Sequence, residues 1–188
     1  DYIIERMLSN DLLIPYDKDF GDAPNYIDNV SPYIVEELFN QIEGNGKNAN
    51  DYSVGYMWGT TGLLYNREFV SDEDVNTWDV LRRPEYAGKI LVKDAFRDVY
   101  TSLLISFNMD AIERGEKNIQ TIGFDASEES IAKVEEYLRS FKEGVAGWEA
   151  DFGKDQMTKG LAWINLSWSG DAQWATDEAA EVGVDLNY

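Results

Sequence analysis

The sequence predicts an α/β fold in which helices flank a mostly parallel central sheet. Segments rich in β-branched and aromatic residues alternate along the chain with segments whose apolar residues recur at helical spacing. Two short apolar runs, KILVKD (89–94) and AWINLSW (162–168), each lead directly into a helical segment, which is typical of parallel strands joined by crossover helices. A chain of 188 residues can form one sizeable domain or two small lobes.

The first third of the chain predicts two helices and the start of the strands. Apolar residues at helical spacing predict a helix over residues 1–9. A Ser-Pro pair at 31–32 begins a second helix, which Gly44 closes. The aromatic and β-branched residues of YSVGYMWGTTGLLYN (52–66) predict one or two strands buried on at least one face.

The rest of the chain alternates helices with strands. Ser127 is a good N-cap for one of the helices, because two glutamates follow it in the first turn. The predicted elements are helices at 78–81, 94–107, 127–141, 155–160 and 171–182, and strands at 89–94, 162–168 and 184–188. Trp163 and Trp174 fall on the buried faces of their predicted strand and helix, so both are expected to be core residues.

Composition excludes several classes of function. The 36 acidic residues outnumber the 16 basic ones and give a net charge of -20, a field that repels nucleic acid and anionic lipid and attracts cations. The chain has no cysteine and no histidine, so disulfides, thiol nucleophiles and the commonest zinc ligand are excluded. No apolar run approaches the length of a membrane span. We expect no cofactor and no metal site, since the aspartates of residues 17–28 depart from calcium-loop spacing.

Carboxylates and aromatic rings gather at two predicted strand-to-helix junctions. Asp94 and Asp98 lie at the first, where they can form part of a cation site or simply cap the helix and occupy its first turn. Trp168 and Asp171 lie at the second, in LSWSGDAQW. A ring face beside a carboxylate suits an ammonium whose methylene chain also needs apolar cover, although Trp168 can equally belong to the core with Asp171 as a cap.

Three stretches resemble, in order and spacing, the polyamine-binding proteins of bacterial spermidine/putrescine ABC transporters, of the periplasmic-binding-protein type 2 family. They are YSVGYMWGTTGLLYN, TWDVLRRPEYAGKILVKDAFRDVY and LAWINLSWSGDAQWA. The resemblance implies a periplasmic-binding-protein-like lobe with a partial first lobe. Residues 1–53 would be the remnant of the first lobe, and 54–188 the second lobe with its hinge strands. Members of the family are longer than this chain, so their later ligand residues have no counterpart here.

The resemblance also implies the residues of a polyamine site. Trp168 matches the ring that stacks on the methylene chain, Asp171 the carboxylate that grips an amine, and Asp98 the acid at the start of the first-junction helix. Tyr2 matches a tyrosine of the first lobe, and Asp94 matches an acid of the same turn as Asp98.

The function implied by the resemblance is binding without catalysis. Such a protein hands its polyamine to a permease and an ATPase from the periplasm or the cell surface, where a lipid anchor upstream of this sequence can hold it. Two alternatives remain open at this point. One is a protein of the same fold that binds another cation or a metal, and the other is a glycosidase with a pair of carboxylates.

Overall fold

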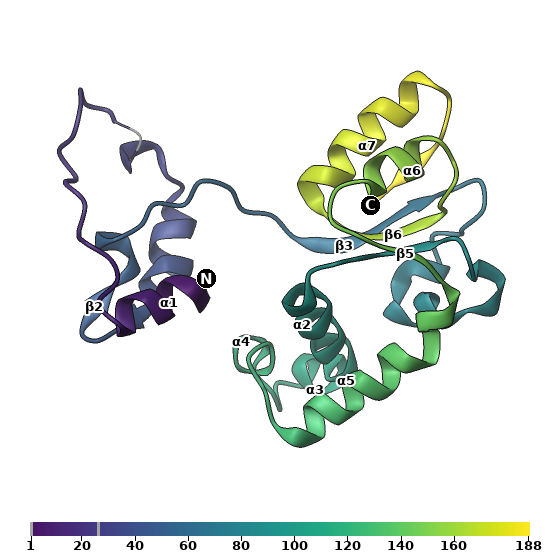
Figure 1. Cartoon of the computed structure of the whole chain (residues 1–188), viewed down its shortest axis with the longest axis horizontal. Helices are drawn as coiled ribbons and strands as arrows, with labels where there is room; N and C mark the ends of the chain where they lie inside the picture. The colour runs from purple at the N-terminus through teal and green to yellow at the C-terminus, as the bar shows by residue number, and fades with distance from the viewer. Residues whose placement is uncertain (1, 26) are drawn as a thin grey trace. The chain divides into compact units, whose positions relative to one another are not determined.

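The computed structural model describes residues 2–25 and 27–188. The chain divides into two compact units, residues 1–58 and 59–188, which are shown in Figure 1. The boundary between the units falls after Trp58, within the segment 52–66. It lies a few residues beyond position 53, where the resemblance places the end of the first-lobe remnant. Only Thr61–Asn66 of that segment forms a strand, so residues 53–60 connect the units without regular structure.

The first unit is small and mostly irregular. Its helix α1, Tyr2–Ser9, buries Leu8 and confirms the helix predicted over 1–9. The helix predicted from 31–32 begins as expected at residues 32–33, but it continues as a π-helical turn at Ile34–Leu38 and a 3-10 turn at Phe39–Gln41 and so ends before Gly44. Beyond it, β1 (Glu43–Gly44) and β2 (Lys47–Asn48) form a hairpin. The residues at 45 and 46 have positive φ angles of 52° and 71°, the backbone that a tight hairpin turn requires.

The second unit is built on a five-stranded sheet of order β5-β4-β6-β3-β7. Its strands in chain order are β3 (Thr61–Asn66), β4 (Ile90–Lys93), β5 (Val145–Glu149), β6 (Ile164–Trp168) and β7 (Leu186–Asn187). The α/β fold is therefore confirmed. Sequence analysis missed β5, whose Ala and Gly give it little apolar pattern and which lies at the edge of the sheet beside β4.

The sheet is mixed, whereas the sequence predicts a mostly parallel one. Strand β4 is parallel to both β5 and β6, but β3 is antiparallel to both β6 and β7. The pairing of Thr61 with Trp168 sets the direction of β3. Because that contact joins residues far apart in sequence, the local pattern of residues 52–66 carries no information about it.

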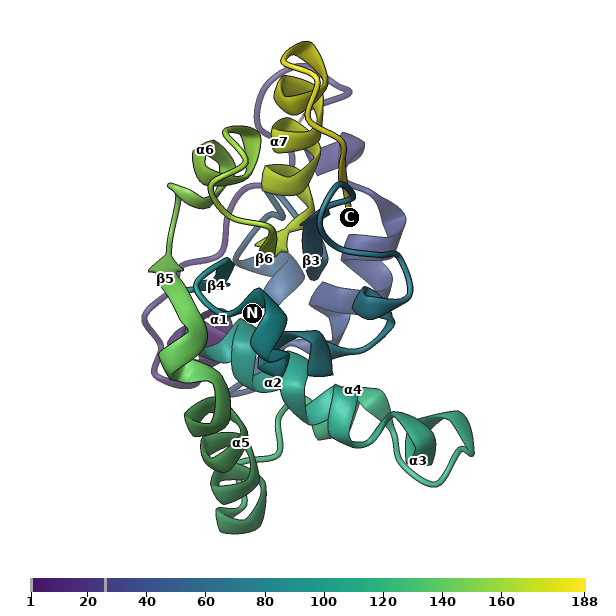
Figure 2. The same ribbon diagram turned by 90° about the vertical axis from the view of Figure 1, so that its right-hand side faces the viewer.

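Helices cover both faces of the sheet, as Figures 1 and 2 show. The larger core lies on the face of α2 and α5, where Ile90 and Val92 of β4 point. The smaller core lies on the face of α6 and α7, where Leu91 points. The helices are α2 (Phe96–Phe107), α3 (Met109–Glu113), α4 (Ile119–Ile122), α5 (Glu128–Phe141), α6 (Gly153–Thr158) and α7 (Ser169–Glu181).

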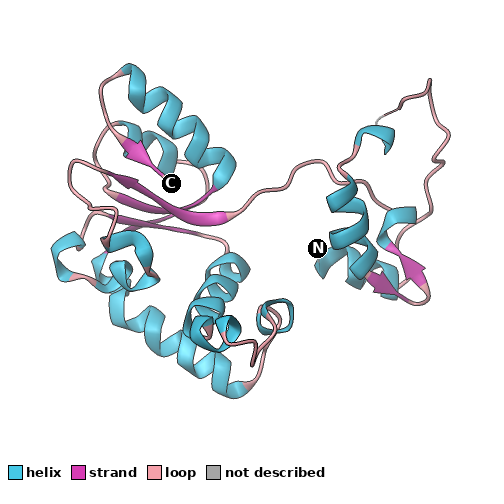
Figure 3. Ribbon diagram, turned by 180° about the vertical axis from the view of Figure 1, so that it is seen from behind, coloured by secondary structure: helices cyan, strands magenta, loops and turns pink. Residues whose placement is uncertain are grey.

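The sheet of the second unit lies between two layers of helices, as Figure 3 shows. Strands β4 and β6 each lead within a few residues into the first turn of a helix, α2 and α7 respectively. Among the residues that the model describes, no helix is both long and apolar enough to cross a membrane.

Candidate functional site

The candidate site lies at the carboxyl ends of β4, β5 and β6. Trp168 is the last residue of β6, Asp171 lies in the first turn of α7, and Asp98 lies in the first turn of α2. Because β4, β5 and β6 are parallel, their carboxyl ends lie at one edge of the sheet, where α/β proteins bind ligands. The fold therefore brings both predicted junctions together.

Trp168 and Asp98 are in direct contact. The indole Nε1–H of Trp168 donates a hydrogen bond of 2.7 Å to Asp98 Oδ2. The Trp168 residue is 42% exposed, so it is not the core residue that the structural alternative required. The hydrogen bond fixes the plane of an accessible ring beside a carboxylate, which is the pairing that an alkylammonium ligand needs.

Lys93 is one of three residues of the cluster, with Glu149 and Lys154, that sequence analysis missed. Its ammonium is buried at the end of β4, 3.2 Å from Glu149 Oε1 and 3.0 Å from Asp171 Oδ2. It also donates to the carbonyl of Ala150 at 3.0 Å and lies over the Trp168 ring, 4.1 Å from its centroid. The sequence carried one signal for Lys93, which is a lysine inside an apolar strand. Strand alternation places this lysine on the same face of the sheet as Leu91, the face that α6 and α7 cover.

The strand register explains how Glu149 reaches Lys93. The two residues are partners in the β4–β5 ladder, and both side chains are 1% exposed. The second oxygen of Glu149 accepts a hydrogen bond from the backbone N–H of Gly153 at the start of α6. Both oxygens of this buried carboxylate are thus satisfied, as burial of a charge requires.

Asp171 is paired with two lysines of the chain itself. Lys154 Nζ lies 3.2 Å from Asp171 Oδ1 and 2.7 Å from the exposed Asp151. These hydrogen bonds, chiefly the one to Asp151, raise the pKa of Lys154. The carboxylate predicted to grip a ligand amine therefore already holds two ammonium groups.

Asp94 lies in the turn between β4 and α2. It does not cap that helix, whose N-cap is Ala95 without a side-chain hydrogen bond. Asp94 lines a pocket of about 630 Å³ together with Trp148, Phe152 and Lys154. Tyr2, the fifth predicted residue, belongs to α1 of the other unit and is 42% exposed.

The other tryptophans divide between core and surface. Trp163 packs against the larger core and stacks on Phe69 with ring centroids 4.5 Å apart, as expected of a structural residue. The expectation that Trp174 is buried is wrong, since it is 44% exposed on α7. Trp58 is 67% exposed, with its ring centroid 6.1 Å from that of Tyr33.

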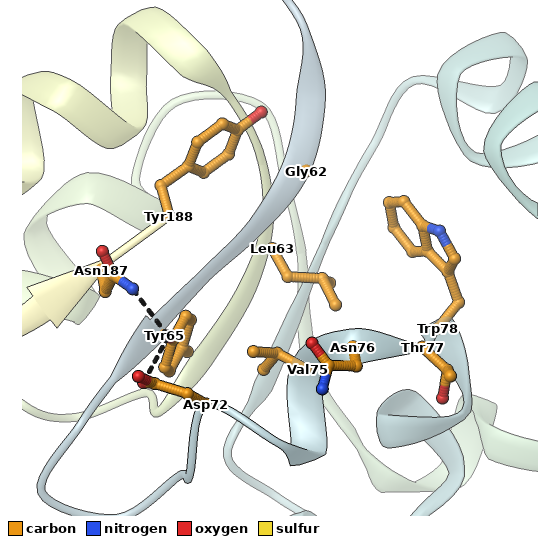
Figure 4. A pocket seen from close by; sticks show the side chains of 10 residues that line it. All are labelled: Gly62, Leu63, Tyr65, Asp72, Val75, Asn76, Thr77, Trp78, Asn187 and Tyr188. Carbon is orange, nitrogen blue, oxygen red and sulfur yellow. Dashed lines mark hydrogen bonds between the residues drawn. The ribbon is translucent and has the colours of Figure 1, made fainter.

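A second pocket, of about 450 Å³, lies along β3 and is drawn in Figure 4. Its polar groups bond one another, because Tyr65 donates to Asp72 and Asn187 donates to the Tyr65 hydroxyl. The acids of the described residues form no cluster of three or more that could hold a metal ion.

Comparison with known proteins places the chain in a family. The family model for bacterial extracellular solute-binding proteins matches residues 1–185. The spermidine/putrescine-binding periplasmic protein of Escherichia coli is 23% identical over 183 residues, which cover 97% of this chain and 46% of that protein. The chain spans about half the length of the curated relatives that match nearly all of it.

Solved structures share the fold. The spermidine/putrescine ABC transporter substrate-binding protein of Streptococcus pneumoniae matches with a TM-score of 0.68 and 26% identity, covering 100% of this chain and 50% of that one. A protein of Listeria monocytogenes assigned to spermidine/putrescine ABC transport matches with a TM-score of 0.74 and 26% identity, at the same coverage. The α/β fold agrees with the family match over residues 1–185: the chain belongs to the bacterial extracellular solute-binding protein family.

Proposed function

We propose that this chain binds a linear polyamine, such as putrescine or spermidine, as the solute-binding component of an ABC importer. The observation that carries the proposal is the exposed Trp168 ring whose N–H is fixed to the Asp98 carboxylate. A ring face covers the methylene chain of a polyamine, and a carboxylate forms a charge-assisted hydrogen bond with its ammonium. The names of the E. coli and S. pneumoniae relatives support the same ligand class.

The surroundings of the ring favour a cation. The net charge of -20 concentrates cations near the surface, and the 630 Å³ pocket is lined by three aspartates, Asp94, Asp151 and Asp155. No bond is made or broken in this role. The protein would act in the periplasm or at the cell surface, and release its ligand to a permease driven by an ATPase.

We also infer that the two units correspond to parts of the two lobes of the family. In this proposal residues 1–53 are a remnant of the first lobe, to which Tyr2 belongs, and 54–188 are the second lobe with its hinge strands. The separation of the chain into units at residues 58 and 59 supports it. Because buried contacts from both lobes contribute to affinity, a protein limited to these residues would bind weakly.

Calorimetric titration of the natural full-length protein that carries this sequence tests the proposed function. Putrescine and spermidine should give saturable heats that magnesium chloride at matched ionic strength does not reproduce. Trp168→Leu should weaken polyamine binding by about tenfold. Trp174→Leu is the matched control, since the two tryptophans are 42% and 44% exposed, and it should leave the affinity unchanged. Equal, salt-sensitive heats from every cation, unaffected by Trp168→Leu, would mean that only the diffuse negative field attracts them.

A further inference from the structure

We propose that Lys93 is a specificity-determining residue of this site: its ammonium occupies the cation position between Asp171 and Trp168, so the ligand's ammonium binds at Asp98. The inference rests on the proposed polyamine function and goes beyond it. It assigns to Asp98 the ammonium contact that the family resemblance gives to Asp171.

The surroundings of Lys93 are those of a complete ammonium site. A lysine ammonium has three N–H donors. Those of Lys93 have three acceptors, namely Glu149 Oε1 at 3.2 Å, Ala150 O at 3.0 Å and Asp171 Oδ2 at 3.0 Å. The Trp168 ring centroid, 4.1 Å away, adds a cation–π contact. A binding protein would contact a ligand amine through groups of this kind: two carboxylates, a carbonyl and a ring face. Here they contact the ammonium of the protein's own Lys93.

Asp171 consequently has little charge left to offer a ligand. Lys93 bonds one of its oxygens and Lys154 the other. The inner part of the cluster contains two ammonium groups, Lys93 and Lys154, and two carboxylates, Glu149 and Asp171, so it is neutral. The remaining acid, Asp151, is 87% exposed and screened by water.

Asp98 has the opposite character. It accepts the indole hydrogen bond of Trp168 and forms no ion pair with any residue that the structure describes. Its carboxylate lies next to an accessible ring. An incoming ammonium therefore gains more at Asp98 than at Asp171, where it would have to compete with two lysines.

This arrangement also orients the ligand. Lys93 covers one face of the Trp168 ring, so the methylene chain stacks on the other face. The N–H edge of the ring points to Asp98, and the terminal ammonium follows it to that edge.

A double-mutant cycle on the natural full-length protein that carries this sequence tests the inference. Putrescine is titrated into the wild type, Asp98→Asn, Asp171→Asn, the double variant Lys93→Met/Glu149→Gln, and that double variant with Asp171→Asn. We expect Asp98→Asn to weaken binding by about tenfold or more, and Asp171→Asn by less than about threefold. In the double variant Asp171 no longer pairs with Lys93, so adding Asp171→Asn should then lower the affinity for putrescine about tenfold. Glu135→Gln, which removes an exposed carboxylate outside the cluster, matches the change in net charge of the two aspartate variants and should leave putrescine binding unchanged.

The outcomes separate the two proposals. If wild type binds putrescine and Asp171→Asn abolishes binding equally in both backgrounds, the ligand contacts Asp171 directly and the inference is overturned while the function stands. If wild type shows no saturable polyamine binding, the proposed function falls and takes the inference with it.

A second measurement decides the question if the double variant does not fold. The methylene next to the Lys93 ammonium should show an NMR ring-current shift that disappears in Trp168→Leu. Retention of that shift at saturating putrescine is the expected result, because Lys93 stays in place. Its loss on putrescine binding would show that the ligand displaces Lys93, and would overturn the inference.

Discussion

Replacing Lys93 with methionine tests how strongly the buried ion network stabilises the site. Methionine keeps the length of the stem but removes the charge, so Glu149 remains 1% exposed without its cation. Removing one partner of a buried pair typically costs about 3–5 kcal/mol. Asp171 keeps Lys154, and the backbone N–H of Gly153 still bonds Glu149, so we expect the lower part of that range, about 3 kcal/mol.

The compensated variant Lys93→Met/Glu149→Gln makes this expectation specific. It removes a cation and an anion together, so its free energy of unfolding should lie within about 1–2 kcal/mol of the wild type. Urea denaturation measures all three proteins, with the slope m checked for constancy. Lys159→Met, in a pair whose side chains are 61% and 62% exposed, should cost less than about 1 kcal/mol.

Two results would refute the reasoning. If Lys93→Met costs under about 1 kcal/mol, the buried charge of Glu149 is not the penalty that the structure implies. If the double variant is as unstable as the single one, the loss comes from packing of the lysine stem rather than from an uncompensated carboxylate.

Three further predictions concern parts of the second unit outside the ligand contacts. A hydrogen bond from Tyr86 is the chief cause that lowers the pKa of Asp74 to about 2. The Asp74 carboxylate therefore adds stability above its unfolded pKa of 3.8, and this stability is lost as the pH falls through about 2. Asp74→Asn should flatten the profile of thermal stability against pH in that window. Gly153→Ala should cost about 1–3 kcal/mol in urea denaturation, since its Cβ would lie 2.6 Å from the carboxyl carbon of Glu149. Ser127→Ala should cost about 1 kcal/mol by the same assay, because the Ser127 side chain accepts the N–H of Ser130 at the start of α5. An unchanged urea midpoint in either of the last two would contradict the contact concerned.

Most elements of the second unit could be predicted because their signals are local. The cap at Ser127, the helical spacing behind it and the apolar run before Asp94 depend on neighbours within one or two turns. Strand β5 was missed for the same reason, because its sheet neighbour is β4, more than fifty residues away. Trp174 was misplaced because the helix periodicity does not show which faces of α7 other elements cover.

Three residues of the site were predictable, whereas its two lysines, Glu149 and the pairing among these groups were not. Resemblance pointed to Trp168, Asp98 and Asp171, and the structure brings these three to one edge of the sheet. Nothing in the local sequence distinguishes Asp98 from Asp171, since each lies in the first turn of a helix that follows a strand. The difference between them is Lys93, whose position in an apolar strand was visible but whose partners were not.

The sequence by itself determined the class of the protein: an acidic α/β chain without thiols or imidazoles, with carboxylates and rings at two strand-to-helix junctions. Tertiary structure decided the direction of β3 and which carboxylates are already neutralised. Composition and periodicity are properties of neighbouring residues, whereas the Coulomb energy of an ion pair depends on a separation of a few ångströms in space. Lys93 and Asp171 reach that separation only because β4 and β6 pair in parallel.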